Sequence, residues 1–425
     1  MSIRRRILEH PLADRLVDQL RGVACHAVGG TVRDALLGVS TRDLDVSVSE
    51  EGERIARDLG QASAGRMIKL GGDRFASYRI VASEFQADIW DRLGGSLRAD
   101  LERRDLTINS IAVDFASADA LEDPFGGRAD LEAGLLRATR LDCFERDPLR
   151  VLRLARFRVQ LAGFSIGAET ASAARAARAG LTSVAKERVR DELRLILSRA
   201  RAARGFHALD ELGLLPVLFP SLAGRTEGLI ERAAGLDEAL SALGRRPSLA
   251  KWDELDRWQA AVGLLAGSGS SDPSEAAGEL ERTGHVTRGD ARAAGRLCEA
   301  RIPGDDDARR LFLADQGERW GLALALAAAR AGLSVAQVDE LAGRIEHTLD
   351  DSPDLRTAPA PLVDGTSTAR ILGVEPGPEV GRALRALIEA QILGRIRTRA
   401  EAEEFLRRRA GAASDPTSRS PSSAG

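Results

Sequence analysis

The stretch HAVGGTVRDALLGVSTRDLDVSV, His26 to Val48, decides the fold of the first part of this 425-residue chain. Its apolar, glycine and charged residues predict a buried strand, a glycine turn, a short helix and a second strand, in that order. The second strand carries Asp43 and Asp45, and side chains two residues apart on a strand point to the same face. Both carboxylates therefore project from one face, where they can share a metal ion.

The glycine turn precedes a helix expected over residues 31–37. Gly29 and Gly30 carry no side chains, Thr31 is a plausible N-cap, and Arg33 is placed to reach a phosphate. The pattern GGTVRD is neither the dinucleotide fingerprint GxGxxG nor the loop GxxxxGK[ST], so a dinucleotide-binding protein is excluded on spacing. A phosphate-binding turn beside paired carboxylates is typical of nucleotidyl transfer with Mg²⁺, whereas an isolated DxD is common on solvated edge strands.

Composition limits the class of protein. The apolar fraction is 44%, enough for more than one core, and no run of about 18 apolar residues predicts a membrane span. The basic N-terminus is not followed by an apolar segment, so a secretory signal is not expected. Three scattered cysteines, Cys25, Cys143 and Cys298, fit the reducing cytoplasm and no disulfide framework.

The pattern of elements changes along the chain. An amphipathic helix is expected over 1–21 and another over 50–60; strands are expected over 23–28, 43–48, 67–70, 77–82 and 85–90. These predict an α+β head with a mixed sheet. From about Leu149 strand signals end, and the periodicity is helical. Proline and glycine clusters near 215–222, 267–273 and 351–361 are candidate joints between helical parts.

Positive charge gathers in one segment although the net charge is −3. Residues 137–206 hold 16 arginines and lysines against 7 acidic residues. Such an excess is an electrostatic footprint for nucleic acid, or it reflects the arginine-rich composition of a chain with only three lysines. Both interpretations remain open on charge alone.

Two further stretches carry paired polar residues. In LERRDLTINS, Asp105 and Asn109 are four apart and share a face if the segment is helical, where they could hold a ribose and phosphates. In ERDPLRVLRLARF, Asp147 and Arg150 are three apart, and an acceptor beside a donor fork can hydrogen-bond the edge of a base. The alternatives are an ordinary first turn of a helix and a salt bridge within a helix.

Together these stretches resemble the class II tRNA nucleotidyltransferase and bacterial poly(A) polymerase family. GGTVRD with DLD resembles its first motif, RRDLTIN its second, DPFGG the loop after it, and ERDPLR its nucleotide-selecting motif. The resemblance covers about residues 20–222. It returns weakly over 373–406, which resemble the C-terminal tRNA-contacting helices of CCA-adding members.

The resemblance implies a polymerase-beta-like nucleotidyltransferase head followed by an all-α neck, body and tail. The expected divisions are a head over 1–140, a neck with nucleotide-selecting and RNA-binding helices over 141–222, a body over 223–350, a tRNA-contacting tail over 351–410 and a disordered end over 411–425. It also implies template-independent addition of C and A, from CTP and ATP, to the 3′ end of tRNA.

The resemblance further implies a set of site residues. Asp43 and Asp45 are the expected Mg²⁺ ligands and catalytic residues, and Asp147 and Arg150 are expected to read the Watson–Crick edge of the incoming nucleotide. The ribose and triphosphate are assigned to Arg104, Asp105 and Asn109. The rest of the expected nucleotide-binding set is Gly29, Gly30, Arg33, Arg153 and Arg156.

Two departures from the family pattern keep alternatives open. Arg146 precedes Asp147 where the family usually has Glu, and the connection between Trp90 and Leu101 is short, as in CC-adding members. A CC-adding or A-adding partial enzyme and a poly(A) polymerase therefore remain candidates. A non-catalytic RNA-binding protein is a candidate of another class, and the intact pair Asp43 and Asp45 argues against it. The sequence does not indicate an oligomeric state.

Overall fold

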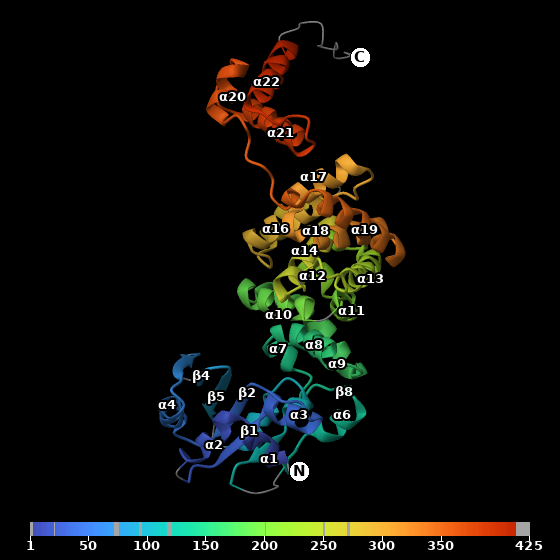
Figure 1. The fold of residues 1–425 in the computed structure, drawn as a ribbon. Coiled ribbons are helices and arrows are strands. Elements are labelled where there is room, and N and C mark those ends of the chain that lie inside the picture. The colour runs from blue at the N-terminus through green and yellow to red at the C-terminus, as the bar shows by residue number, and fades with distance from the viewer. Residues whose placement is uncertain are drawn as a thin grey trace. The chain divides into compact units, whose positions relative to one another are not determined.

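The chain folds into two compact units in the computed structural model (Figure 1). The structure describes residues 3–20, 22–71, 76–92, 96–116, 121–199, 201–249, 251–269 and 273–413. The first unit comprises residues 1–196 and 207–220, and the second comprises 197–206 and 221–425. One division therefore falls beside the expected joint at 215–222, while the finer division into head, neck, body and tail stays a prediction.

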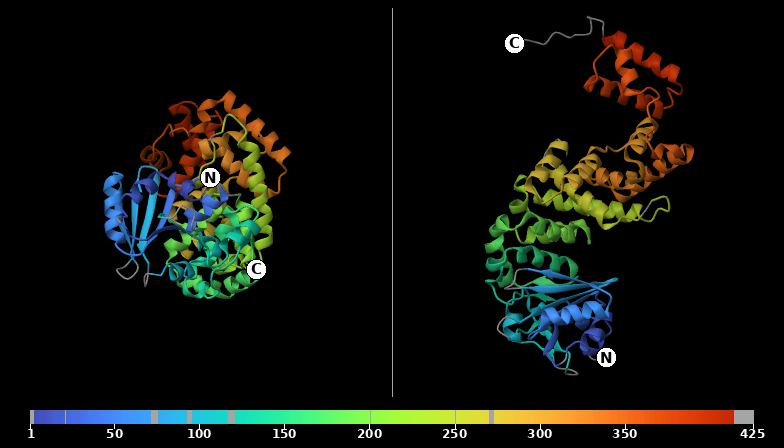
Figure 2. Two further views of the ribbon diagram at one scale, coloured as in Figure 1. Left: turned by 90° about the horizontal axis from the view of Figure 1, so that it is seen from below. Right: turned by 90° about the vertical axis from the view of Figure 1, so that its left-hand side faces the viewer.

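The first unit is built on a seven-stranded mixed sheet with the strand order β3-β4-β5-β2-β1-β6-β7. Only β2 and β5 pair in parallel, and every other neighbouring pair is antiparallel. Helices α2, α3 and α4 pack on this sheet (Figure 2). The bounds are β1 Cys25–Val28, α3 Gly29–Leu37, β2 Asp43–Val48, α4 Gly52–Ala62, β3 Arg66–Leu70, β4 Ser77–Ala82, β5 Phe85–Asp91, β6 Ala112–Asp114 and β7 Leu121–Glu122.

The expected strands and the short helix before β2 are confirmed. The fully buried β1 and the inner half of β2 place apolar side chains in the core, as their largely apolar sequences predict. Gly38 ends α3 in the left-handed conformation, with φ of 73°, which glycine adopts without strain.

Three local expectations were wrong. Residues 1–21 form two helices, α1 (Ile3–Leu8) and α2 (Pro11–Val17), because Pro11 cannot continue the first helix and the His10 side chain caps the second. Thr31 is not an N-cap, since α3 already begins at Gly29, after Val28. A two-residue strand, β9 (Ser165–Ile166), also follows Leu149, and it pairs in parallel with β8 (Leu135–Leu136).

Helices complete the first unit. Helix α8 buries Leu152, Leu154 and Phe157, and the guanidinium groups of Arg153 and Arg156 lie over the ring of Phe157. The helical elements are α5 Leu97–Glu102, η3 Thr107–Asn109, α6 Gly127–Ala133, α7 Cys143–Arg146, α8 Leu149–Gln160, α9 Ala168–Ala177, η4 Arg178–Ser183, α10 Lys186–Ser198, α11 Ala202–Glu211 and α12 Leu215–Leu218; α10 and α11 extend into the second unit.

The described part of the second unit is entirely helical. Its central helix α18 is buried on nearly all sides, which explains the continuous apolar run in its sequence. The helices are η5 Pro220–Leu222, which straddles the division, α13 Thr226–Leu243, α14 Glu254–Gly269, α15 Pro273–Thr283, α16 Arg288–Glu299, α17 Asp306–Gln316, η6 Gly317–Arg319, α18 Trp320–Ala331, α19 Val335–Asp351, η7 Pro353–Arg356, α20 Gly365–Leu372, α21 Pro378–Ile392 and α22 Arg399–Ala413. Among the described helices none is both long and apolar enough to cross a bilayer.

Candidate active site

Asp43 and Asp45 lie at the N-terminal end of β2, which is the middle strand of the sheet. Asp43 is exposed and Asp45 is half-buried, while Leu44 between them is in the core. The alternation confirms that both carboxylates share one face of the sheet. The Asp43 carboxylate makes no hydrogen bond or ion pair with another described residue, so its oxygens remain available to a ligand.

The start of α3 is fastened to this strand by three hydrogen bonds. The backbone N–H of Gly30 donates to Asp45 Oδ2 at 3.1 Å. The Thr31 hydroxyl donates to the backbone oxygen of Asp43 at 3.1 Å and accepts from the backbone N–H of Asp45 at 2.7 Å. Thr31 therefore joins the helix to the strand, a role that the expected N-cap did not include. Because the Gly30 N–H donates to Asp45 in this conformation, it is not free to bind a phosphate.

Close approach by neighbouring side chains requires a glycine at position 29. Gly29 has φ of +66°, and a Cβ placed there would lie 2.6 Å from Arg104 Nη1 and 2.9 Å from Asp45 Oδ2. Both distances are too short for any side chain, and the positive φ adds strain for any residue except glycine. The turn thus brings the helix start, a carboxylate and a guanidinium within contact of one another.

The electrostatics of the site depend on three neighbours of Asp45. Burial raises the pKa of Asp45, Arg104 opposes that rise, and Asp88 and Asp43 add to it. Asp88 lies directly across from Asp45 on β5, but Arg79 binds both of its oxygens, at 2.8 and 2.7 Å. Both carboxylate oxygens of Asp88 are therefore already paired with Arg79. Because a cation beside Asp45 would stabilise its charged form, the site favours binding of a positive ion.

The donor set fits Mg²⁺. Two carboxylates on one face supply hard oxygen ligands, and Mg²⁺ typically keeps waters and substrate phosphates as its other ligands. Within the part of the chain that the structure describes, no cluster of three or more His, Cys, Asp or Glu side chains is arranged to hold a metal ion. In a site of two carboxylates, waters and substrate phosphates would supply the other ligands of the ion.

Arg33 connects α3 to the second motif. Its Nη1 donates to Asn109 Oδ1 at 2.8 Å, and its Nε donates to Asp34 Oδ1 at 2.8 Å. Its guanidinium also lies 5.3 Å from the ring centre of Phe157 on α8. Asp34 thus pairs with Arg33.

Asp105 is the centre of a buried network. The segment from 105 to 109 is not one helix as expected, because Asp105 lies in a bend after α5 and Asn109 ends the 3₁₀ turn η3. The two side chains nevertheless meet: Asn109 Nδ2 donates to Asp105 Oδ1 at 2.9 Å. The same oxygen accepts from the Leu106 N–H at 2.9 Å, and Arg153 Nε donates to the other oxygen at 2.8 Å.

Arg104 lies between the glycine turn and α5. Its guanidinium is 5.2 Å from the ring centre of Trp90, and its Nη2 is 3.6 Å from Asp100 Oδ2. Its Nε is buried and has no hydrogen-bond partner among the described residues. Arg104 therefore retains donor capacity next to Asp45, where a triphosphate would place its negative charge.

Asp147 and Arg150 are close but loosely paired. Asp147 ends α7 and Arg150 lies in the first turn of α8, so the pair spans a break between helices. The Arg150 Nε to Asp147 Oδ2 distance is 3.9 Å, and Arg188 lies 3.8 Å from the same oxygen. Arg150 Nη2 donates to the backbone oxygen of Arg103 at 2.7 Å, which links the two motifs.

The remaining arginines of α8 diverge in their partners. Arg153 turns to Asp105, whereas Arg156 pairs with Glu192 on α10 at 2.9 Å and lies 4.8 Å from the Phe157 ring centre. The structure thus gathers Gly29, Gly30, Arg104 and Asp45 directly and connects Arg33, Asn109, Asp105 and Arg153 in a chain. It leaves Arg156 in a salt bridge of its own. No local pattern in the sequence predicts the contacts that Thr31, Arg79 and Glu192 make here.

The chain matches two family models. Residues 74–137 match the poly(A) polymerase head domain, and residues 163–225 match the probable RNA- and SrmB-binding site of polymerase A. The A-adding tRNA nucleotidyltransferase of Deinococcus radiodurans is 33% identical, over 90% of this chain and 94% of that protein. The CC-adding tRNA nucleotidyltransferase of Thermus thermophilus is 32% identical, over 89% of this chain and 92% of that protein.

Solved structures share the fold. The CCA-adding enzyme of Bacillus stearothermophilus in complex with CTP has a TM-score of 0.69 and 24% identity, covering 96% of this chain and 98% of that one. The Thermotoga maritima CCA-adding enzyme complexed with tRNA has a TM-score of 0.63 and 20% identity, covering 96% and 98%. The mixed-sheet start and helical remainder are therefore the fold of these proteins.

Proposed function

The chain belongs to the class II tRNA nucleotidyltransferase and bacterial poly(A) polymerase family and is a tRNA nucleotidyltransferase, and we propose that it adds C and A from CTP and ATP to tRNA 3′ ends. One observation carries the proposal. Asp43 and Asp45 share a face of β2, and the glycine turn brings Asp45 against the start of α3 and Arg104. The carboxylates proposed to bind the metal and the groups proposed to bind the triphosphate therefore lie close together.

We propose that Asp43 and Asp45 hold Mg²⁺. Bound there, the ion would supply positive charge for the triphosphate and for the attacking 3′-hydroxyl. Arg104 then has two roles in the chain itself: it offsets the repulsion among the carboxylates, and the positive charge of its guanidinium would attract the triphosphate. Thr31 keeps the backbone of both aspartates fixed while the charges around them change.

Nucleotide selection is assigned to Asp147 and Arg150. Their long contact leaves an acceptor and a donor fork whose hydrogen-bonding capacity is mostly unused within the pair. A base edge that offers the complementary donor and acceptor can bind there without breaking a strong internal salt bridge. Arg153 supports this surface from Asp105, and Arg156 supports it from Glu192.

Of the residues expected to bind the ribose and triphosphate, two have their hydrogen-bonding groups already occupied. Asp105 and Asn109 already satisfy each other, with Arg153 and Arg33 as their outer partners. We propose that these two residues position the arginines, and that the triphosphate is contacted by Arg104 and by Arg33 beside Gly30. A ribose hydroxyl would reach Asn109 only by replacing one of these internal partners.

A partial enzyme is the second candidate. Relatives that match the chain almost throughout include an A-adding and a CC-adding protein. The connection from the end of β5 at Asp91 to the start of α5 at Leu97 is also short. Both observations favour addition of only part of the CCA sequence.

Extension of three tRNAs separates these candidates. The purified protein is incubated with Mg²⁺, labelled CTP or ATP, and tRNAs that end before CCA, after C or after CC. Completion of all three supports full CCA addition. Extension limited to C residues, or to the final A, supports a partial enzyme, and repeated A addition to unrelated RNA supports a poly(A) polymerase. If no substrate is extended, the proposed function is wrong.

A further inference from the structure

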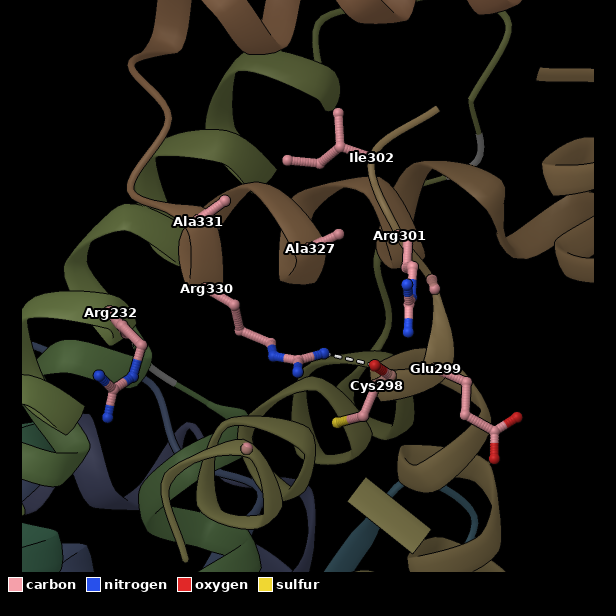
Figure 3. Close-up of a pocket in the computed structure, with 10 residues that line it drawn as sticks. Arg232, Cys298, Glu299, Arg301, Ile302, Ala327, Arg330 and Ala331 are labelled. Atoms are coloured by element: carbon pink, nitrogen blue, oxygen red, sulfur yellow. Dashed lines mark hydrogen bonds between the residues drawn. The ribbon is translucent and has the colours of Figure 1, made fainter. Parts of the chain in front are cut away.

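A basic pocket lies in the second unit and shares no residue with the candidate active site. It has a volume of about 630 Å³ and is lined by faces of α13, α14 and α18 and by the segment that follows α16. Three of its lining residues are arginines, Arg232, Arg301 and Arg330, against one acidic residue, Glu299. Figure 3 shows Arg330 between the other two arginines and the Glu299 carboxylate pointing away from them.

The internal contacts of these arginines use little of their hydrogen-bonding capacity. Arg232 Nη2 donates to Ser268 Oγ at 2.8 Å, but its Nε is buried without a partner among the described residues. Arg330 donates to the backbone oxygen of Cys298 near the end of α16. Arg301 makes no hydrogen bond or ion pair with any described residue. Since each guanidinium carries five N–H donors, most donors in the pocket remain unassigned.

A purely structural role explains one arginine of the three. Arg330 satisfies a carbonyl in the last turn of α16, where a cation is favourable. Gly267 makes room for it, since a Cβ there would lie 3.1 Å from Arg330 Nε. Neither contact accounts for Arg301, which is exposed and has no hydrogen-bond or ion-pair partner among the described residues.

We propose that this pocket binds a phosphate group, and that the RNA backbone is its source. Guanidinium forks match the oxygens of a phosphate, and several of them around one cavity select for that chemistry. A chain with a net charge of −3 cannot attract RNA through its overall charge, so it needs local sites of this kind. The RNA source rests on the proposed function, whereas the phosphate chemistry does not.

The shape of the pocket agrees with a phosphate that is part of a larger molecule. Ile302 and Ala327 form an apolar wall next to the guanidinium groups. The volume lies in the range of pockets that accept a whole small ligand. A sugar attached to the bound phosphate can therefore lie against this wall.

Arg301→Gln is the variant of choice because Arg301 supports no internal contact. We expect tRNA to bind about fivefold more weakly, since one charge-assisted hydrogen bond is lost. The slope of log Kd against log salt should fall by about one, as for the loss of one phosphate contact. The kcat at saturating tRNA should not change, while the KM for tRNA rises. Arg296→Gln is the matched control, because Arg296 is exposed on α16 outside the pocket.

A second measurement uses inorganic phosphate and needs no RNA. The unfolding temperature of each full-length protein is compared in phosphate and in chloride at equal ionic strength. We expect phosphate to stabilise the wild type and Arg296→Gln more than Arg301→Gln. This measurement stays informative even if the protein extends no tRNA, so the pocket and the proposed function can fail separately.

The outcomes decide between the sources of phosphate. Weaker tRNA binding specific to Arg301→Gln supports the RNA backbone, with or without an effect of inorganic phosphate. A loss of phosphate stabilisation with unchanged tRNA binding supports a site for free phosphate and overturns the RNA source. If Arg301→Gln behaves as Arg296→Gln in both measurements, the proposal is wrong.

Discussion

Two Asp–Arg pairs of the first unit differ in almost every property that decides what a charged pair can do. Asp105 and Arg153 are 2.8 Å apart, and their side chains are 6% and 38% exposed, so the carboxylate of this pair is buried while the guanidinium is not. Asp147 and Arg150 are 3.9 Å apart, with side chains 34% and 22% exposed. Asp105 also accepts hydrogen bonds from Asn109 and from the Leu106 backbone, whereas Asp147 has only a second long contact, to Arg188.

The difference distinguishes a pair that stabilises the local fold from a pair that can bind a ligand. Removing one partner of a buried, hydrogen-bonded pair leaves donors without acceptors, so such a pair holds the local fold together. A long and partly exposed pair contributes little to stability, and its polar atoms are available to a ligand. We therefore assign the positioning of the site to Asp105 and base recognition to Asp147 and Arg150.

The strongest test of this contrast is Asp105→Ala. We expect the free energy of unfolding to fall by about 3 kcal/mol, because Asn109, Leu106 and Arg153 all lose their acceptor. Urea denaturation followed by circular dichroism measures the loss. A fall of less than about 1 kcal/mol would remove Asp105 from its assigned structural role.

Acid should weaken the same pair. Burial alone would raise the pKa of Asp105, but the Arg153 guanidinium and the hydrogen bonds from Asn109 and Leu106 hold that pKa well below its usual range. A depressed pKa in the folded state gives stability that is present above the unfolded value of about 3.9 and is lost as the pH falls below it. The stability difference between wild type and Asp105→Asn should therefore shrink as the pH falls from about 4 towards about 2. A difference that stays constant over this range would contradict the assignment.

Arg150→Ala tests whether Asp147 and Arg150 recognise the base. We expect the preference for CTP and ATP over UTP and GTP to fall about tenfold, since one fork of base-edge hydrogen bonds is lost. The tRNA affinity should change less than this selectivity. Single-nucleotide incorporation with each triphosphate measures the preference, and Arg146→Ala is the control, because Arg146 is a neighbouring exposed arginine paired with Asp142. Unchanged selectivity in Arg150→Ala would refute the recognition role.

The smallest expected effect is the change in the free energy of unfolding when Asp147 of the Asp147–Arg150 pair is replaced. Asp147→Ala should change the free energy of unfolding by less than about 0.5 kcal/mol, because both of its ion pairs are long and partly exposed. The same urea titration provides the comparison with Asp105→Ala. A loss similar to that of Asp105→Ala would erase the distinction between the two pairs.

The sequence was sufficient for features that depend on local order. The period of two in β2, the glycine turn and the left-handed Gly38 are properties of a few consecutive residues, and the structure confirms them. The mixed sheet and the helical remainder were also predicted. The break at Pro11 was missed because the apolar spacing continues across it, although proline is a strong local signal.

Contacts between distant segments could not be predicted in the same way. Asp105 and Asn109 were expected to meet on a helix, and they meet across a bend and a 3₁₀ turn instead. Nothing in the sequence indicated that Arg153, 48 residues later, would bind Asp105. The hydroxyl of Thr31 likewise acts on residues 12 and 14 positions away, which only the packing of α3 on β2 decides.

The central claim, that Asp43 and Asp45 carry nucleotidyl transfer, is tested most directly by the single-turnover rate of Asp43→Ala on tRNA. With saturating Mg²⁺ and nucleotide, we predict a rate at least about a thousandfold below the wild type, because several kcal/mol of transition-state stabilisation are lost. The tRNA affinity should stay within about twofold of the wild type, since Asp43 is not assigned to RNA binding. Asp18→Ala, an exposed aspartate at the end of α2, should retain the full rate. Transfer at the wild-type rate by Asp43→Ala would contradict the claim and move the metal site elsewhere.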